Sequence, residues 1–290
     1  MNTIWSSCIQ NIELLYRTRQ LRFDDRFKEN YVRAFGIDGM KRILEIGAGP
    51  GALAQALKRW YPHAEVTGSD RDTAFLAFAK TQRPDIEFVE ADIASLPFSD
   101  GSFDVTISNT VQEHVEPSKF FGEQYRVLRP GGACLVLSSR KGINIVSDSV
   151  TEMSEFEKEM YQKTEQYDRA TNEKYDVGKY GCSEQELPLE MSRYGFQQVQ
   201  THYVTVNLTP DSDQYDAEFA VKMIEANRSV HLNSLESLPH TAPGVVSDAE
   251  MKKWSEAVNR KYDKRIEEYR SGDKRWDTNV SVIMVLRGIK

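Results

Sequence analysis

The chain has 290 residues, 40% of them hydrophobic, and a formal net charge of −7 at pH 7. This length is long for one domain but fits an α/β domain with insertions, and the apolar fraction is sufficient for a substantial core. Because the balance is acidic and no long run of lysine and arginine offsets it, we expect no nucleic-acid partner and no membrane surface.

The first residues lack the basic segment and apolar core of a signal peptide, and no window approaches the roughly 20 apolar residues of a membrane helix. We therefore expect a cytoplasmic protein. Cys8, Cys134 and Cys182 are odd in number and widely spaced, so reduced thiols are predicted, with no disulfide and no metal site.

Residues 4–35 are mostly compatible with helices, with apolar side chains recurring on one face. Such a segment either packs on the domain or folds over a ligand as a lid. It carries Arg19, Arg22 and Arg26, for which solvated surface is one interpretation and contact with a ligand carboxylate is the other.

A strand, a glycine-rich turn and a helix follow one another from residue 43. The apolar run 43–46 leads into Gly47, Gly49 and Gly51, and helix-forming residues begin at Ala52. Glycine is needed where a ligand approaches the backbone closely or where φ is positive, and a helix N-terminus adds a positive end. The pattern indicates a surface for a nucleoside cofactor, although an ordinary βα turn has the same local appearance.

Two further strands each end at an aspartate. Residues 65–70 end at Asp70, about 20 residues after the glycines, where a carboxylate can bind ribose hydroxyls. Residues 86–93 end at Asp92 and Ile93, a pair that suits a purine because the carboxylate accepts from its amine and the branched side chain packs on its face. Residues 103–109 predict a fourth strand, and 128–132 a turn into a fifth strand at 133–138.

In this order and spacing, the residues resemble the class I S-adenosylmethionine-dependent methyltransferases, in particular their small-molecule branch called type 11. The resemblance covers residues 40–140 and extends loosely to the end. It implies an α/β fold with a Rossmann-like, seven-stranded, mostly parallel sheet, helices on both faces and an antiparallel last strand. It also implies S-adenosyl-L-methionine as cofactor. The implied cofactor-binding residues are Glu45, Gly47, Gly49 and Gly51 around the methionine part, Asp70 at the ribose, Asp92 and Ile93 at the adenine, and Asn109 at the end of the fourth strand, together with Ala48 and Arg71.

Two alternatives accompany this interpretation. A nicotinamide-dependent dehydrogenase also fits the loose glycine fingerprint of residues 47–52. It would not account for the Asp92–Ile93 pair or the 128–132 turn. Some 40 residues also precede the first strand, whereas a dinucleotide-binding fold often begins with that strand almost at once. A catalytically silent protein that binds S-adenosylmethionine as a sensor or assembly partner would keep the same cofactor residues.

The methyl group on a sulfonium is electrophilic, so transfer requires an acceptor lone pair in line with it and the exclusion of water. Good alignment alone can supply about 7–11 kcal/mol. His114, just past the fourth strand, is the candidate general base, and bracing of its loop is the other interpretation. The chain lacks the Asn/Asp-Pro-Pro-aromatic motif and the Pro-Cys nucleophile of nucleic-acid methyltransferases, which favours a small-molecule acceptor under a helical lid.

One domain spanning 1–290 is expected, with additions to a core. The parts are an N-terminal helical cap (1–40), a cofactor-binding core (41–142), an insertion (143–181), more core (182–208), a helical insertion (209–276) and a final strand (277–290). A helix is predicted at 184–193 and strands at 197–208 and 280–287. The tyrosines of 143–181 either line a cavity or pack. In 209–276, an apolar helical stripe behind a Ser247–Glu250 capping box either packs on the domain or forms a homodimer interface.

Overall fold

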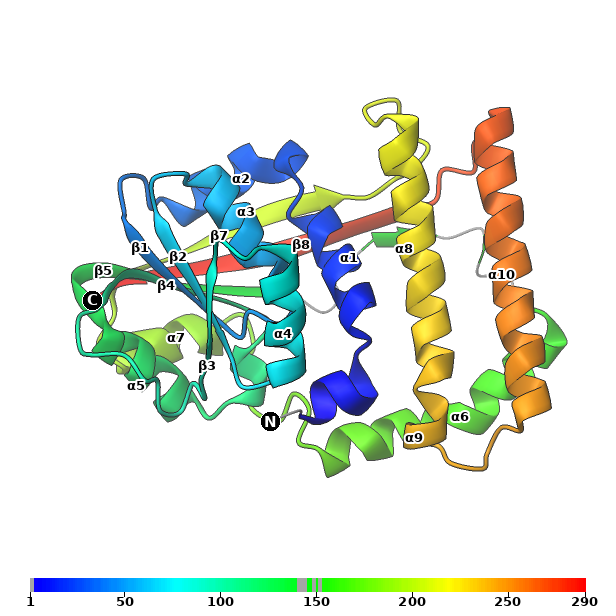
Figure 1. The fold of residues 1–290 in the computed structure, drawn as a ribbon, viewed down its shortest axis with the longest axis horizontal. Helices are drawn as coiled ribbons and strands as arrows, with labels where there is room; N and C mark the ends of the chain where they lie inside the picture. The colour runs from blue at the N-terminus through cyan, green and yellow to red at the C-terminus, as the bar shows by residue number, and fades with distance from the viewer. Residues whose placement is uncertain (1–2, 140–144, 148–149, 151–152) are drawn as a thin grey trace.

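The computed structural model describes residues 3–139, 145–147, 150 and 153–290. A mixed sheet runs through its middle, with helices on both sides (Figure 1). The strands are β1 (Arg42–Ile46), β2 (Glu65–Asp70), β3 (Glu87–Glu90), β4 (Phe103–Asn109), β5 (Leu128–Ser139), β6 (Ile145–Ser147), β7 (Gln197–Asn207) and β8 (Thr278–Ile289). The helices are α1 (Ile12–Arg22), α2 (Lys28–Phe35), α3 (Ala52–Trp60), α4 (Thr73–Gln82), α5 (Pro117–Val127), α6 (Glu155–Lys174), α7 (Glu186–Arg193), α8 (Ala217–Glu236), α9 (Leu238–Thr241) and α10 (Asp248–Ser271).

The strand order confirms the predicted Rossmann-like sheet. It runs β3-β2-β1-β4-β5-β8, and β7 also pairs with β8. Strands β1 to β5 are mutually parallel, whereas β8 is antiparallel to both β5 and β7. All seven predicted strands are present, and the short β6 adds an eighth at the start of β8. The order reverses between β1 and β4, and ligands bind at the carboxyl ends of the strands at such a switch point.

Alternating side chains give the sheet two apolar faces, as the pleat of a strand requires. Ile43, Val105 and Ile107 belong to one hydrophobic cluster, which α2, α3, α4 and α8 cover. Leu44 and Ile46 belong to the other, which α5 and α7 cover. Both faces are therefore buried, as predicted for a largely parallel sheet.

Local signals explain where several elements begin and end. Gly51 precedes α3 with φ at 85°, and the Ser247–Glu250 capping box at the start of α10 is formed as predicted. Pro188 lies in the first turn of α7, where a missing N–H costs no helical hydrogen bond. The third strand is shorter than predicted: β3 stops at Glu90, so the Asp92–Ile93 pair lies in the loop that follows. The predicted boundary at residues 142 and 143 lies outside the described residues.

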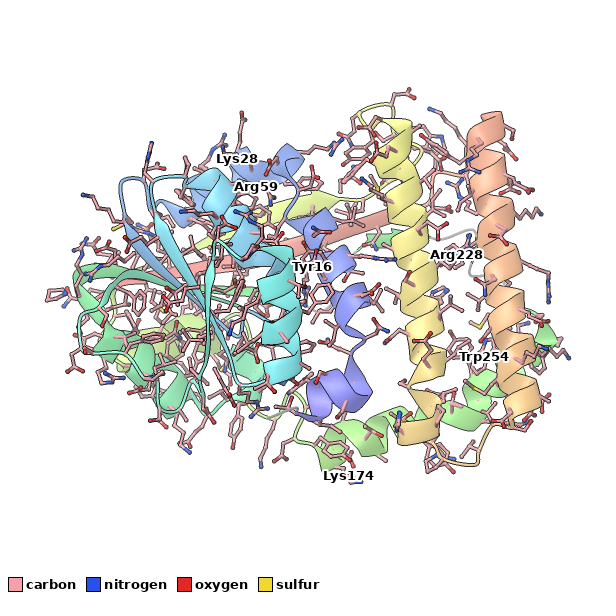
Figure 2. The ribbon with its side chains drawn as sticks, viewed as in Figure 1. Tyr16, Lys28, Arg59, Lys174, Arg228 and Trp254 are labelled. Carbon is pink, nitrogen blue, oxygen red and sulfur yellow. The ribbon has the colours of Figure 1, made fainter. Side chains whose placement is uncertain are left out.

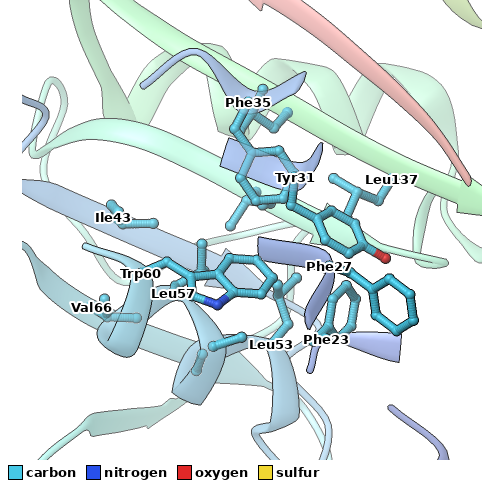
Figure 3. Packing of buried hydrophobic residues seen from close by; sticks show 14 of the residues in the cluster. Phe23, Phe27, Tyr31, Phe35, Ile43, Leu53, Leu57, Trp60, Val66 and Leu137 are labelled. Carbon is cyan, nitrogen blue, oxygen red and sulfur yellow. The ribbon is translucent and has the colours of Figure 1, made fainter. Parts of the chain in front are cut away.

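Aromatic packing attaches the N-terminal cap to the core. Tyr31 of α2 stacks on Trp60 of α3 with ring centroids 5.4 Å apart, and Phe23 lies 5.3 Å from Tyr31 (Figure 3). The indole N–H of Trp60 donates to Asp25 at 2.8 Å. The cap is thereby held on one face of the sheet, and α1 lies between α4 and α8 (Figure 1).

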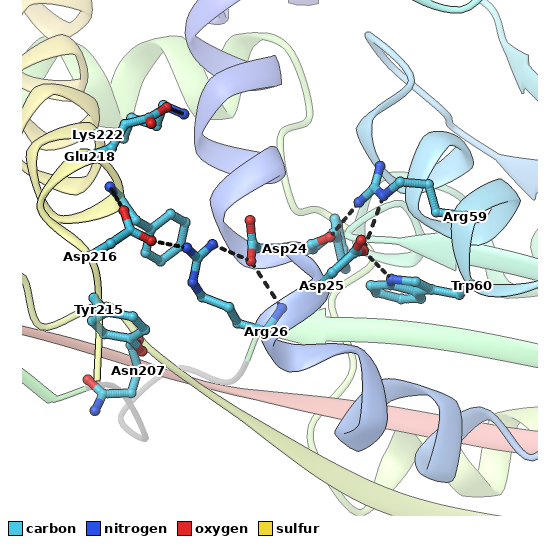
Figure 4. A network of polar contacts seen from close by, with 12 residues as sticks. Asp24, Asp25, Arg26, Arg59, Trp60, Asn207, Tyr215, Asp216, Glu218 and Lys222 are labelled. Carbon is cyan, nitrogen blue, oxygen red and sulfur yellow. Dashed lines mark hydrogen bonds and ion pairs between the residues drawn. The ribbon is translucent and has the colours of Figure 1, made fainter. Parts of the chain in front are cut away.

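Polar contacts join the cap to the helical insertion as well. Arg26 pairs with Asp24 and with Asp216, the residue that caps α8, and its guanidinium lies 4.0 Å from the ring centroid of Phe219 (Figure 4). Arg26 is therefore used structurally.

No helix in the described part of the chain has a stretch long and apolar enough to cross a membrane.

The helical insertion builds a third hydrophobic cluster, from α6, α8, α9 and α10. The apolar stripe predicted on α10 points into it: Trp254, Val258, Tyr262 and Ile266 are all buried there (Figure 2 labels Trp254). This stripe therefore packs within the chain. Helix α8 also contributes Phe219 to the cluster on the sheet, so the insertion continues the core.

Candidate functional site

A cavity of about 610 Å³ opens at the carboxyl ends of the parallel strands. Its floor consists of the turns after β1, β2, β3 and β4, and its walls come from the cap and from the end of the 143–181 insertion. Ten of the eleven residues predicted for the site line it: Glu45, Gly47, Ala48, Gly49, Asp70, Arg71, Asp92, Ile93, Asn109 and His114. Only Gly51 is not among the lining residues.

The glycines of the first turn serve different purposes. Gly47 has φ at 67°, and a Cβ there would lie 2.4 Å from a methyl group of Val111, so the turn after β4 occupies the space of a side chain. Gly49 has φ at 52° and borders the cavity. A Cβ on Gly51 would meet the Phe88 ring at 2.9 Å, so this glycine allows α3 and β3 to pack.

Asp70 connects the glycine turn to the start of α4. One carboxylate oxygen accepts the Gly49 N–H and the other accepts the Asp72 N–H, both at 2.8 Å. Burial raises the pKa of Asp70, and these two backbone hydrogen bonds oppose that shift. A cavity-lining carboxylate held by two donors keeps lone pairs for further donors.

Glu45 is a buried carboxylate with an oxygen left over. Its side chain is 2% exposed, and its Oε2 has no hydrogen-bond partner among the described residues. Burial raises the pKa of Glu45 well above its usual value, and neighbouring Asp70 adds to this. An orphaned buried oxygen at a cavity wall fits a cationic or hydrogen-bond-donating group of a ligand.

Arg19 supplies the complementary cation. Its Nη2 donates to Thr110 Oγ1 at 3.2 Å, and no carboxylate of the described residues lies within ion-pairing distance of it. Burial lowers the pKa of Arg19 to about 10. The sequence had left surface and ligand contact open for three arginines, and the structure brings this one to the cavity. An unpaired guanidinium in such a wall fits an anionic group, most favourably a carboxylate.

Two further turns complete the floor. After β3, Asp92 accepts the Ala94 N–H at 2.8 Å through one oxygen, and the neighbouring Ile93 is buried. After β4, Asn109 is followed by Thr110, whose φ of 54° is unusual for a β-branched residue. Such strained backbone is typical of binding sites, where the surrounding structure enforces it.

His114 lies on the turn after β4 and contacts both walls. Its Nδ1 lies 3.0 Å from the backbone nitrogen of Gly178, and its ring meets Trp5 edge-on at 4.7 Å between centroids. Burial lowers the pKa of His114. Of the tyrosines in the 143–181 insertion, Tyr180 lines the cavity, whereas Tyr161 packs on Trp254.

The cap closes the cavity through a carboxylate that the sequence did not single out. Asp72 accepts hydrogen bonds from the backbone N–H and hydroxyl groups of both Thr3 and Ser6, between 2.6 and 3.2 Å. This anchors the π-helical turn Trp5–Ile9, whose ends line the cavity. Asp72 was recognisable only as a helix N-cap before Thr73.

The comparisons with known proteins agree with this geometry. A family model described as a methyltransferase domain matches residues 44–136. Residues 44–136 of the chain are thus similar to a methyltransferase domain, the class that the order of its motifs indicates. Demethylmenaquinone methyltransferase of Thermus thermophilus is 37% identical over 139 residues, which are 46% of this chain and 63% of that protein. Phthiotriol/phenolphthiotriol dimycocerosates methyltransferase of Mycobacterium tuberculosis is 40% identical over 98 residues, 32% of this chain and 36% of that protein.

The chain therefore spans less than two thirds of the length of these relatives. Among solved structures, phosphoethanolamine N-methyltransferase 2 of Haemonchus contortus in complex with S-adenosyl-L-methionine shares the fold, with a TM-score of 0.53 at 16% identity. That match covers 99% of this chain and 59% of the other. Within the described residues of the chain, no group of three or more His, Cys, Asp or Glu side chains is arranged to hold a metal ion.

Proposed function

We propose that this chain transfers the methyl group of S-adenosyl-L-methionine to a small-molecule acceptor. The observation that carries the proposal is a pair of ionisable side chains beside the glycine turn that form no ion pair among the described residues, the buried Glu45 carboxyl and the half-buried Arg19 guanidinium. The methionine part of S-adenosyl-L-methionine is an amino acid and carries an ammonium and a carboxylate. Its ammonium is complementary to Glu45, and its carboxylate is complementary to Arg19. The Gly47 position, where no side chain fits, adds a close approach to the backbone.

The other floor residues suit the nucleoside part. Asp70 would accept hydrogen bonds from ribose hydroxyls, with Arg71 beside it. The second oxygen of Asp92 would accept from the adenine amine while Ile93 packs on the ring. Asn109 and the backbone of Ala48 line the space between, and Gly51 contributes by letting the turn and α3 adopt their packing.

When bound, the cofactor supplies an electrophilic methyl group on sulfur. The chain's own residues then have to position the acceptor and exclude water, which is where most of the rate gain of such a reaction arises. The Trp5–Ile9 turn, anchored on Asp72, and the Val177–Tyr180 side of the cavity provide that cover. Their apolar and aromatic side chains favour an acceptor with an apolar body.

Further parts of the proposal concern partners and organisation. The acceptor is proposed to be a small molecule and not a nucleic acid, in a cytoplasmic protein that is one methyltransferase domain over 1–290. Within it, 1–40 is the cap, 41–142 and 182–208 with the final strand 277–290 form the core, and 143–181 and 209–276 are insertions. A homodimer through 209–276 would have to use surfaces other than the α10 stripe, which is buried.

Calorimetric titration tests the proposal, with S-adenosylmethionine, S-adenosylhomocysteine and NAD as parallel ligands. We expect micromolar binding of both sulfur compounds and none of NAD. Arg19→Gln should weaken binding of S-adenosylhomocysteine at least tenfold, whereas Arg17→Gln, an exposed arginine on the same helix paired with Glu13, should leave it unchanged. Binding of NAD alone would indicate a nicotinamide-dependent dehydrogenase. Binding of S-adenosylmethionine without methyl transfer to any acceptor would favour the catalytically silent binding protein.

A further inference from the structure

We infer that His114 is not the general base of this site but a positioning residue: its Nδ1 latches the 177–180 wall of the cavity, and its Nε2–H is a hydrogen-bond donor for the methyl acceptor. This inference rests on the proposed function for the acceptor and on the structure alone for the latch. It also narrows the acceptor to a molecule that carries a hydrogen-bond-accepting atom and that reacts without losing a proton to His114.

The first step is the tautomer. A backbone N–H can only donate, so the Gly178 N–H at 3.0 Å requires a lone pair on His114 Nδ1. A neutral imidazole has one such lone pair, and its proton then sits on Nε2. The ring lines the cavity, and Trp5 meets it edge-on with 4.7 Å between centroids.

The second step is what this leaves for chemistry. A general base must offer a free lone pair to the proton it removes. The lone pair of His114 is already used by Gly178, so taking a proton would mean releasing that contact. In the transfer, the acceptor's lone pair forms the bond to the methyl carbon, the carbon–sulfur bond breaks, and its electrons return to sulfur. A proton on the acceptor stays on it during the transfer and is lost to solvent after the product leaves the cavity.

The third step is the latch itself. Two more hydrogen bonds join the same two segments: the Gln112 side-chain amide donates to the Tyr180 carbonyl at 2.8 Å, and the Tyr180 N–H donates to the Glu113 carbonyl at 2.9 Å. With His114–Gly178 they hold Val177 and Tyr180 at the cavity. His114 is thus part of the closed wall, and the acceptor site depends on its neutral form.

The charged groups that face His114 are Glu113, which favours its protonation, and Arg71, which opposes it. Burial opposes it too and is the largest of the three effects on the pKa. Protonation would place a hydrogen on Nδ1, opposite the Gly178 N–H. The contact would then become repulsive, so acid should open this wall.

The test uses the ligand-free protein. ¹⁵N NMR of the histidine rings, with His114 assigned through its variants, should show Nδ1 unprotonated and Nε2 protonated at neutral pH. Hydrogen exchange should show protection of the 177–180 amides that is kept in His114→Asn, whose Oδ1 can replace Nδ1. It should be lost in His114→Gln, whose longer side chain places its amide near Nε2 instead.

An Nδ1–H tautomer, or a protonated His114 at neutral pH, would overturn the inference. Equal protection in the two variants would overturn the latch. Because neither measurement needs a ligand, both are independent of the titration that tests the proposed function. Once an acceptor is found, two results together would show that His114 is the general base after all. The rate of methyl transfer would rise as His114 loses its proton, and it would fall to the same level in both variants.

Discussion

Asp70 shows how one side chain can organise a site before any ligand arrives. Its two backbone hydrogen bonds, to Gly49 and Asp72, fix the turn after β1 against the start of α4. Asp72 in turn anchors Thr3 and Ser6 of the cap. A substitution at Asp70 is therefore expected to affect ligand binding both directly and through the glycine turn.

We expect Asp70→Ala to weaken binding of S-adenosylhomocysteine by tenfold or more, because a charged hydrogen-bond acceptor contributes about 1.5–3 kcal/mol. Asp70→Asn should be intermediate, since it keeps one oxygen for the Gly49 N–H. Calorimetry on both variants measures the effect. An unchanged affinity in Asp70→Ala would refute the assignment of Asp70 to the ribose.

Gly47→Ala should reduce both stability and affinity. The left-handed backbone costs roughly 1–2 kcal/mol for a residue with a Cβ, and the new methyl would clash with Val111 at 2.4 Å. Combining it with Val111→Ala should recover the steric part but not the backbone part. Denaturant unfolding of both single variants and the double variant separates the two. If Gly47→Ala alone were as stable as the parent, that result would contradict the close approach of the turns after β1 and β4.

His114 predicts a pH dependence of stability. Burial lowers its pKa in the folded chain below the value of about 6.5 for an unfolded histidine, so the unfolded chain binds the proton first. The free energy of unfolding should therefore fall as the pH drops below about 6.5, and level off below the folded pKa. His114→Asn should lack this component. Urea titrations of both proteins between pH 7.5 and 5 give the difference, and parallel curves would contradict it.

At the scale of elements, an ion network closes the base of the helical insertion. Arg265 of α10 pairs with Asp211, shortly after β7, and with Asp277, just before β8, and all three side chains are at most 10% exposed. Asp211 also accepts the backbone N–H groups of Arg275 and Trp276. The network therefore joins the two chain segments by which the insertion leaves and re-enters the sheet.

Arg265→Met should destabilise the protein by about 3–5 kcal/mol, since it leaves the buried Asp211 carboxylate without its counter-ion. Arg260→Met is the matched control on the same helix: its side chain is 69% exposed and its pairing with Glu256 is loose, at 3.7 Å. It should change stability by no more than about 0.5 kcal/mol. Thermal unfolding of the two variants measures this, and similar losses in both would contradict the role of the network.

At the scale of the molecule, the clusters are continuous. Helix α8 contributes Phe219 and Met223 to the cluster on the sheet and Ile224 and Leu235 to that of the insertion. Because α8 shares side chains with both, the insertion should unfold together with the core. The cavity lies on the core that is built around the sheet. The cap and the end of the 143–181 insertion cover it.

We expect one unfolding transition that ligand shifts as a whole. At 100 times its Kd, S-adenosylhomocysteine should add about 2.7 kcal/mol to the free energy of unfolding. For a chain of this size that corresponds to an increase in Tm of roughly 4–5 °C. Calorimetry with and without the ligand, compared with tryptophan fluorescence, measures both. Two separate transitions, of which ligand shifts only one, would show that the insertion folds independently.

The sequence by itself determined the local parts of this protein. The β1 turn with its glycines, the aspartates that close β2 and follow β3, the extent of β4 and the capping box of α10 all depend on backbone needs and on periods of two or 3.6 residues. Such patterns require only neighbours along the chain.

Tertiary structure alone decided the rest. Which of three arginines reaches the cavity depends on how α1 packs on α3 and α8, and Gly51 meets the Phe88 ring because the N-terminus of α3 lies beside β3. The cap is anchored by Asp72 across a separation of 69 residues, and His114 meets Gly178 across 64. No local pattern encodes these contacts, because they arise only when the cap and the insertion pack on the finished sheet.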